Sequence, residues 1–193
     1  MSDLHHEKHL ESYIVQKLAA AGWLVGSTDA YDADRAMYPE DLEAWLRATQ
    51  PQKWDRLQAM NGDKTLTVVM DRLETALEKQ GMVQTLRRGF SIAGAGHLDL
   101  SEAAPEDQRN DAVLHRYASN RLRVVPQLKY HPSRELAIDL GLFLNGLPLA
   151  TVELKTDFTQ SVEHAKAQYR TDRHPADPIT KRTHSLLTQH RGA

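Results

Sequence analysis

In the stretch from Arg134 to Lys155, three charged residues stand out against apolar surroundings: Asp139, Glu153 and Lys155. Asp139 lies in the run AIDLGLFL, and Glu153 and Lys155 lie two residues apart in LATVELK. Carboxylates bind hard divalent cations such as Mg²⁺, and a neighbouring lysine can orient a water or stabilise a developing negative charge. This pattern therefore indicates metal-dependent hydrolysis of a phosphodiester.

The two acids meet only if the two apolar runs pair as a hairpin. Asn145 and Gly146 separate the runs and are typical of a hairpin turn. Because side chains alternate along a strand, Glu153 and Lys155 share one face and lie about 7 Å apart. Asp139 must therefore reach that same face from the neighbouring strand.

The length of the turn decides whether Asp139 reaches that face. A two-residue loop sets Asp139 opposite Val152, on the wrong face of the sheet. A three-residue loop with Gly146 left-handed sets Asp139 diagonal to Glu153. We therefore predict the three-residue loop, or an equivalent bulge. A two-residue turn between regular strands would contradict this arrangement.

The predicted metal ligands are Asp139, Glu153 and the backbone carbonyl of Leu154. Mg²⁺ keeps several waters, so two carboxylates and one carbonyl suffice. Lys155 would orient the attacking water or stabilise the developing charge. The same spacing fits a surface ion pair on a half-exposed hairpin, and spacing alone leaves both interpretations open. The apolar flanks favour the functional one, because unpaired charges are costly where burial is extensive.

Composition is that of one globular domain. The chain has 193 residues, of which 40% are hydrophobic and 26% charged, with a net charge of -2. No global basic field therefore indicates nucleic-acid coating. The absence of cysteine fits a reducing compartment and excludes cysteine-ligated zinc. No apolar run reaches membrane-spanning length, so we expect a cytoplasmic protein without a membrane partner.

Periodicity predicts an α/β layer structure. Helices are predicted over about 10–21, 39–50, 65–79, 105–117, 162–169 and 179–190. Strands are predicted over about 23–25, 83–92 and 122–130, and in both halves of the hairpin. Pro126, inside one of these strands, indicates an edge position or a bulge.

The segments NRLRVVPQLKY, AIDLGLFLNGLPLATVELK and AKAQYRTDRHP resemble the N-terminal nuclease domain of type I restriction enzyme R subunits. These subunits belong to the PD-(D/E)xK nuclease superfamily. The resemblance covers nearly the whole chain and is most specific in FLNGLPLATVELK. It implies an α/β fold with a central mixed β-sheet flanked by helices, in a single nuclease domain over residues 1–193. The family's R subunits continue into ATP-binding motor domains, but no GxxxxGK[ST] phosphate loop is present here, so the sequence is either part of a longer motor subunit or a stand-alone nuclease domain. The end HSLLTQHRGA has no terminal cap, and we therefore expect the N-terminal part of a longer motor subunit.

The resemblance also implies roles for individual residues. Asp139 and Glu153 match the metal-binding acids, and Lys155 matches the catalytic lysine. Glu11 matches an acid often found on the first helix, although a solvated residue beside that helix's apolar stripe is an equally good interpretation. Gln168 lies where the family has a Gln-x-x-x-Tyr motif.

The chain departs from the family pattern at two places. Asp172 follows Gln168 at the tyrosine's usual spacing, while Tyr169 is adjacent, so both Gln168 and Tyr169 also fit helix-face residues that pack on the sheet. The proline that names the superfamily is replaced by Ile138, directly before Asp139.

The implied activity is Mg²⁺-dependent endonucleolytic cleavage of double-stranded DNA, after ATP-driven translocation by motor domains outside this chain. The implied partners are the methyltransferase and specificity subunits of a type I restriction complex. A basic C-terminal group fits either phosphate contacts or a solvated surface: Lys166, Arg170, Arg173, Lys181, Arg182 and Arg191. The alternative function is a catalytically weak, nuclease-like module that serves subunit assembly or DNA docking.

Overall fold

The computed structural model describes residues 3–107, 109–131 and 136–154, with the side chains of residues 3–6 left out. Its elements follow in chain order: α1 (Asp3–Ala20), β1 (Leu24–Val25), the 3₁₀ helix η1 (Thr28–Ala30), α2 (Pro39–Thr49), α3 (Pro51–Asn61), the 3₁₀ helix η2 (Gly62–Lys64), α4 (Thr65–Arg88), β2 (Phe90–Ile92), β3 (Gly96–Leu98), α5 (Asp111–Ala118), β4 (Leu122–Lys129), β5 (Ala137–Leu144) and β6 (Leu147–Val152).

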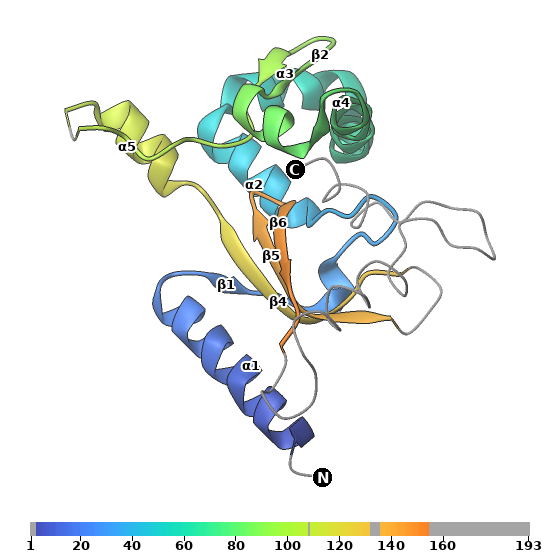
Figure 1. The fold of residues 1–193 in the computed structure, drawn as a ribbon. Helices are drawn as coiled ribbons and strands as arrows, with labels where there is room; N and C mark the ends of the chain where they lie inside the picture. The colour runs from blue at the N-terminus through green and yellow to red at the C-terminus, as the bar shows by residue number, and fades with distance from the viewer. Residues whose placement is uncertain (1–2, 108, 132–135, 155–193) are drawn as a thin grey trace.

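The main sheet has the strand order β1-β4-β5-β6. Strand β1 runs parallel to β4, whereas the β4–β5 and β5–β6 pairs are antiparallel, so the sheet is mixed. Helix α1 lies along one side of the sheet, and α2, α3 and α4 gather beyond its other end (Figure 1). The predicted α/β fold with a mixed sheet flanked by helices is confirmed.

Two hydrophobic clusters hold these layers together. The first joins α2, α3 and α4 to the β2–β3 hairpin, and Leu147 of β6 extends it to the main sheet. The second lies on the main sheet: Tyr31, Ala36, Tyr38, Val125, Leu128, Tyr130, Ile138 and Phe143. The hairpin formed by β5 and β6 thus contributes to both clusters, which fixes the sheet relative to the helices.

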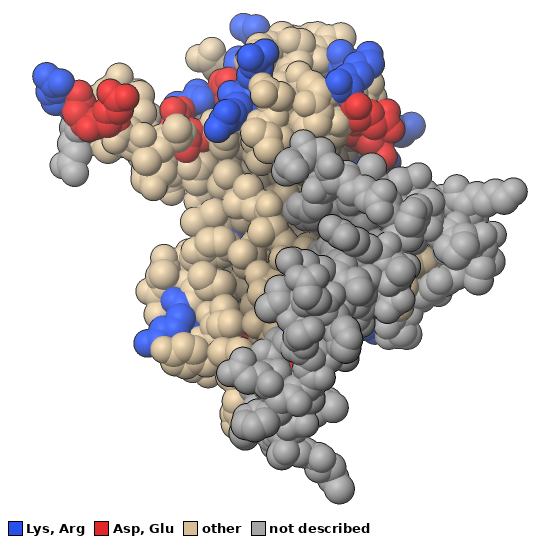
Figure 2. All heavy atoms as spheres, in the orientation of Figure 1, with Lys and Arg blue, Asp and Glu red and all other residues tan. Residues whose placement is uncertain are grey.

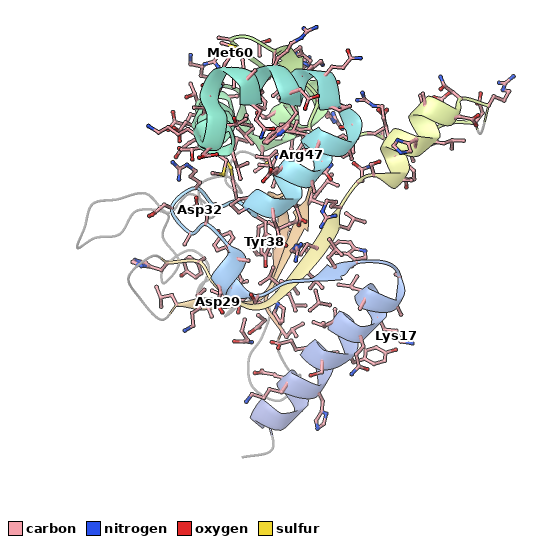
Figure 3. The ribbon with its side chains drawn as sticks, turned by 180° about the vertical axis from the view of Figure 1, so that it is seen from behind. Lys17, Asp29, Asp32, Tyr38, Arg47 and Met60 are labelled. Carbon is pink, nitrogen blue, oxygen red and sulfur yellow. The ribbon has the colours of Figure 1, made fainter. Side chains whose placement is uncertain are left out.

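Tyr38 connects the start of α2 to the sheet, between the helix and the strands (Figure 3). Its ring packs edge-on against Phe143, with centroids 5.8 Å apart. Its backbone N–H donates to the carbonyl of Gly146 at 2.8 Å. A Cβ at Gly146 would lie 2.5 Å from the Tyr38 carbonyl oxygen, so this close approach requires glycine.

A buried ion cluster attaches α2 to β4. Asp41, in the first turn of α2, is fully buried. Arg123 donates to Asp41 at 2.6 Å and 2.9 Å and also bonds Glu40, and Arg121 donates to Asp41 at 2.7 Å. The Asp41 carboxylate raises the pKa of the Arg123 guanidinium above its usual value. Because each buried charge has a charged partner, the cluster fixes the helix to the strand.

Two predicted elements differ from the structure. Gly81 interrupts α4 with φ +75°, as a helix stop should, but the chain then continues as helix to Arg88. The strand predicted over 83–92 is therefore wrong except for Phe90–Ile92, because Met82 and Thr85 are buried one turn apart against the helical layer. Helix α5 begins later than predicted, where the Asn110 side chain accepts from two backbone N–H groups.

The Asn145–Gly146 turn is buried, unlike most hairpin turns. Asn145 has no exposed surface. Both turn residues have positive φ, +50° for Asn145 and +85° for Gly146. The Asn145 side-chain oxygen accepts from the backbone N–H of Arg121 at 2.7 Å. Its side-chain nitrogen donates to the carbonyl of Leu100 and to the side-chain oxygen of Asn120, each at 2.9 Å. The turn therefore joins the start of β4 to the loop after β3.

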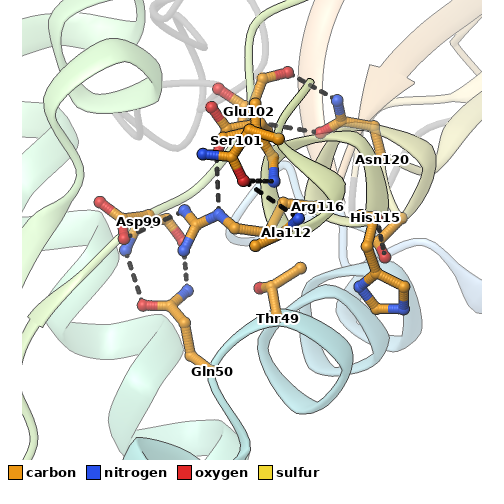
Figure 4. A network of polar contacts seen from close by, with 12 residues as sticks. Thr49, Gln50, Asp99, Ser101, Glu102, Ala112, His115, Arg116 and Asn120 are labelled. Carbon is orange, nitrogen blue, oxygen red and sulfur yellow. Dashed lines mark hydrogen bonds and ion pairs between the residues drawn. The ribbon is translucent and has the colours of Figure 1, made fainter. Parts of the chain in front are cut away.

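Asn120 continues this connection into a polar network (Figure 4). Its amide nitrogen donates to the carbonyl of Glu102 at 2.7 Å. Arg116 of α5 donates to the carboxylates of Glu102 and Asp99, at 2.7 Å and 3.2 Å. Gln50 exchanges two hydrogen bonds with the backbone of Asp99, at 2.8 Å and 3.0 Å. The loop that meets the hairpin turn is thus itself fixed to α5 and to the junction between α2 and α3.

We predict that Asn145→Ala destabilises the domain by roughly 3 kcal/mol, because buried partners lose their hydrogen bonds. Asn145→Gly is the matched control, since it loses the same hydrogen bonds but keeps an unstrained left-handed backbone. It should be less destabilised than the alanine variant by about 1 kcal/mol. Urea unfolding checks both values. An alanine variant as stable as the wild type would show that the hydrogen bonds of the Asn145 side chain do not stabilise the domain.

Candidate active site

The β5–β6 hairpin combines a two-residue turn with a bulge. Leu144 pairs with Leu147 across the turn, so the predicted three-residue loop is wrong. Farther from the turn, however, Leu142 pairs with Ala150 instead of the residue that regular pairing requires. Leu149 is the extra residue on β6. The equivalent bulge that was predicted as the alternative is confirmed, and it shifts the register by one residue.

This shift brings the two candidate acids together. Leu140 pairs with Val152, and the same register continued by one residue sets Asp139 opposite Glu153. The backbone N–H of Leu154 donates to Asp139 Oδ2 at 2.6 Å. Asp139 and Glu153 are both half-buried. The structure therefore places Asp139 beside the segment that carries Glu153 and Leu154, as the metal-site hypothesis requires.

Gln127 links this pair to Glu11. Its side-chain nitrogen lies 3.5 Å from Asp139 Oδ1 and 2.5 Å from Glu11 Oε2. Three elements thus converge: Glu11 comes from α1, Gln127 from β4 and Asp139 from β5. Sequence reasoning missed Gln127, although Pro126 directly before it had marked this part of the strand as irregular.

Strand β4 is indeed irregular at this point. Gln127 has φ +47°, a left-handed conformation that is uncommon for a residue with a Cβ. Val125 and Leu128 are an odd number of residues apart, yet both belong to the cluster on the sheet. The pairing with β5 nevertheless keeps one register on both sides of Gln127, with Pro126 opposite Leu140 and Leu128 opposite Ile138, so Gln127 lies opposite Asp139.

Several of the predicted site residues lie in a part of the chain that the structure does not describe. Lys155, Gln168 and Tyr169 lie outside the described residues, as does the basic C-terminal group. Within the described part of the chain, no three or more histidine, aspartate or glutamate side chains are grouped so that they could hold a metal ion. A metal site formed by the described residues would therefore use two carboxylates with backbone and water oxygens.

Charge on the described surface is mixed. On the face in Figure 2, lysine, arginine and acidic side chains lie together over the helical layer and near α5, whereas the described residues in the middle of that face are mostly neither basic nor acidic and are drawn in tan. No single-sign field dominates the described part of this face. Long-range attraction of DNA would therefore have to come from elsewhere.

Comparison with known families identifies the chain. The family described as Type I restriction enzyme R protein N terminus matches residues 5–186. The chain belongs to this family. No curated protein and no solved structure matches the chain. The expected resemblance is confirmed, and this domain is that of a type I restriction enzyme R subunit, a component of a restriction complex with other subunits.

Among the described residues of this R-subunit domain, no helix is both long enough and apolar enough to cross a membrane.

We predict that Asp139→Ala speeds hydrogen exchange of the Leu154 amide by about 10-fold, because the N–H loses its acceptor. Asp139→Asn keeps one neutral oxygen acceptor and should give a smaller increase. Amide exchange followed by NMR measures both rates. An unchanged rate in the alanine variant would show that the Leu154–Asp139 bond is absent in solution.

Proposed function

We propose that this domain is a Mg²⁺-dependent endonuclease of the PD-(D/E)xK type, which hydrolyses DNA phosphodiester bonds within the R subunit. The observation that carries the proposal is the bulge at Leu149. It sets Asp139 opposite Glu153, the two acids that the family pattern assigns to the metal. Without this irregularity the two side chains would point to opposite faces of the sheet.

The residues present fit a hard divalent cation. Asp139 and Glu153 supply carboxylate oxygens, and Mg²⁺ completes its shell with waters. The N–H of Leu154 points to Asp139. The Leu154 carbonyl, which directly follows Glu153 in the sequence, would be the third protein ligand. When bound, Mg²⁺ supplies Lewis-acid polarisation of the scissile phosphate.

The remaining roles follow from sequence position. Lys155 lies two residues after Glu153 and would orient the attacking water or stabilise the charge that develops on the phosphate. Gln168 would help to hold DNA or shape the site. Glu11 would act through its bond to Gln127, as an acid that shapes the site from α1.

The substrate is double-stranded DNA in this proposal. ATP-driven motor domains of the full-length R subunit would deliver the DNA, and the methyltransferase and specificity subunits would select the site. The basic C-terminal residues would contact phosphates without reading sequence. Such a protein would work in the cytoplasm, where the chromosome and the other subunits are present.

One observation favours a second candidate, a catalytically weak module for subunit assembly or DNA docking. The described residues contain no group of three metal-ligating side chains. A two-carboxylate site is compatible with Mg²⁺, but it binds more weakly than a site with three acids. Failure of the wild-type chain to bind Mn²⁺ at millimolar concentration would support the assembly role.

The test compares restriction complexes that carry the wild-type R subunit or its Lys155→Ala variant, with ATP and Mg²⁺ present. We expect DNA cleavage to fall by at least about 100-fold, because the charge that develops on the phosphate loses its stabilising partner. ATP hydrolysis should be unchanged, since the motor domains are intact. Lys17→Ala, which changes a lysine at the end of α1, is the matched control and should cleave normally. Undiminished cutting by the Lys155 variant would overturn the assignment.

A further inference from the structure

The side chain of Gln127 stands between two acids that come from different layers of the fold. One nitrogen atom lies within reach of both Asp139 Oδ1 and Glu11 Oε2. That nitrogen carries two hydrogens, so it can donate to both carboxylates at once. An amide has no charge, in contrast to lysine or arginine. It can therefore hold the acids in place while leaving their negative charge available to a cation.

The Asp139 carboxylate is oriented by two donors, one on each oxygen. Gln127 approaches Oδ1, and the N–H of Leu154 bonds Oδ2. These donors, one on β4 and one in the segment that follows β6, approach the two oxygens of the carboxylate separately and favour one orientation of the group. Each oxygen accepts through one lone pair and keeps another. The group is thus held in one orientation and can still coordinate a metal.

The backbone of Gln127 is held in its left-handed conformation by Thr28. The Thr28 hydroxyl donates to the Gln127 carbonyl at 3.2 Å and accepts from the N–H of Lys129 at 3.3 Å. Strand β1 stops pairing with β4 after Gly26, so this hydroxyl takes the place of a strand partner beside Gln127. An unfavourable backbone conformation that is fixed on both sides is typical of functional sites.

Helix α1 meets the sheet through a half-buried apolar stripe, Ile14, Val15 and Leu18, and through a polar contact beside it. Its other described side chains, from Glu7 to Ala20, are exposed or half-buried. The bond between Glu11 and Gln127 fixes the helix relative to the strand that carries Asp139.

We propose that Gln127 is a positioning residue of this site. It holds the Asp139 carboxylate in the orientation that meets a divalent cation together with Glu153, and it couples Glu11 on α1 to that orientation. The proposal rests on the proposed function, because it presupposes a metal between Asp139 and Glu153.

Two substitutions distinguish the role of the Gln127 side-chain amide from that of its left-handed backbone conformation. Gln127→Asn keeps the chemistry and tolerates a left-handed backbone, but its amide is one methylene too short to reach the two carboxylates. Gln127→Gly favours the left-handed backbone and removes the side chain altogether. The matched control is Gln16→Asn, which shortens an exposed glutamine on α1 by the same methylene.

Mn²⁺ binding to the full 193-residue chain, measured by electron paramagnetic resonance, is the first readout. We expect both Gln127 variants to bind Mn²⁺ at least about 10-fold more weakly than the wild type, and Gln16→Asn to bind equally well. Thermal unfolding of Gln127→Gly should match or exceed that of the wild type, which excludes misfolding as the cause. Equal Mn²⁺ affinity in the wild type and both Gln127 variants would overturn the positioning role but not the nuclease proposal. A wild-type chain that binds no Mn²⁺ would overturn both.

The side-chain amide signal of Gln127, followed by NMR in the metal-free chain, is the second readout. A purely structural residue elsewhere on β4 would not respond to Glu11. We expect this signal to shift in Glu11→Gln and again in Asp139→Asn, because each substitution removes a charged acceptor. This measurement does not require the Gln127 variants to fold. A signal that moves in neither variant would overturn the proposal.

Discussion

The buried side chain of Asn145 fixes the geometry on which the candidate site depends. Its amide is fully buried. It accepts a hydrogen bond from the backbone N–H of Arg121, directly before β4, and donates to the carbonyl of Leu100, in the loop after β3, and to the side chain of Asn120. The turn therefore has one position and one length. Because both turn residues are left-handed, the hairpin closes with a two-residue turn. An extra residue in one of the two strands must then form a bulge away from the turn. Strand β6 accommodates it at Leu149, and Asp139 consequently lies opposite Glu153.

The site forms where the sheet loses its regularity. The bulge on β6 and the left-handed residue on β4 flank β5, which carries Asp139 between them. At the other end of β4, Arg121 and Arg123 are bound by Asp41 in the buried cluster. These two arginines are therefore not available to neutralise Asp139. Its side-chain contact from β4 is instead an uncharged amide, which suits a carboxylate that must bind a cation.

Sequence reasoning predicted the elements with strong periodicity, and it predicted the hairpin because Asn-Gly separates two apolar runs. It also required an irregularity, since only a shifted register brings Asp139 to Glu153. The place of that irregularity was not predictable, because Leu149 looks like its apolar neighbours. The helix over residues 83–88 was predicted to be a strand, because its burial depends on packing against the helical layer.

Gln127 escaped prediction for a different reason. Its contact with Glu11 spans 116 positions in the sequence, and no local pattern records such a pairing. The buried hairpin turn was unexpected as well, because Asn-Gly turns are normally exposed and only the neighbouring loop makes this one internal. Local signals thus predict the elements, while the contacts that orient the site depend on how distant segments meet.

An anomalous difference map from crystals of the chain soaked in Mn²⁺ tests directly whether Asp139 and Glu153 share a cation. We expect a peak that contacts the carboxylates of both Asp139 and Glu153, and we expect this peak to be lost in crystals of Asp139→Asn. A folded wild-type chain with no peak between these two side chains, or with a peak that contacts neither, would contradict this expectation.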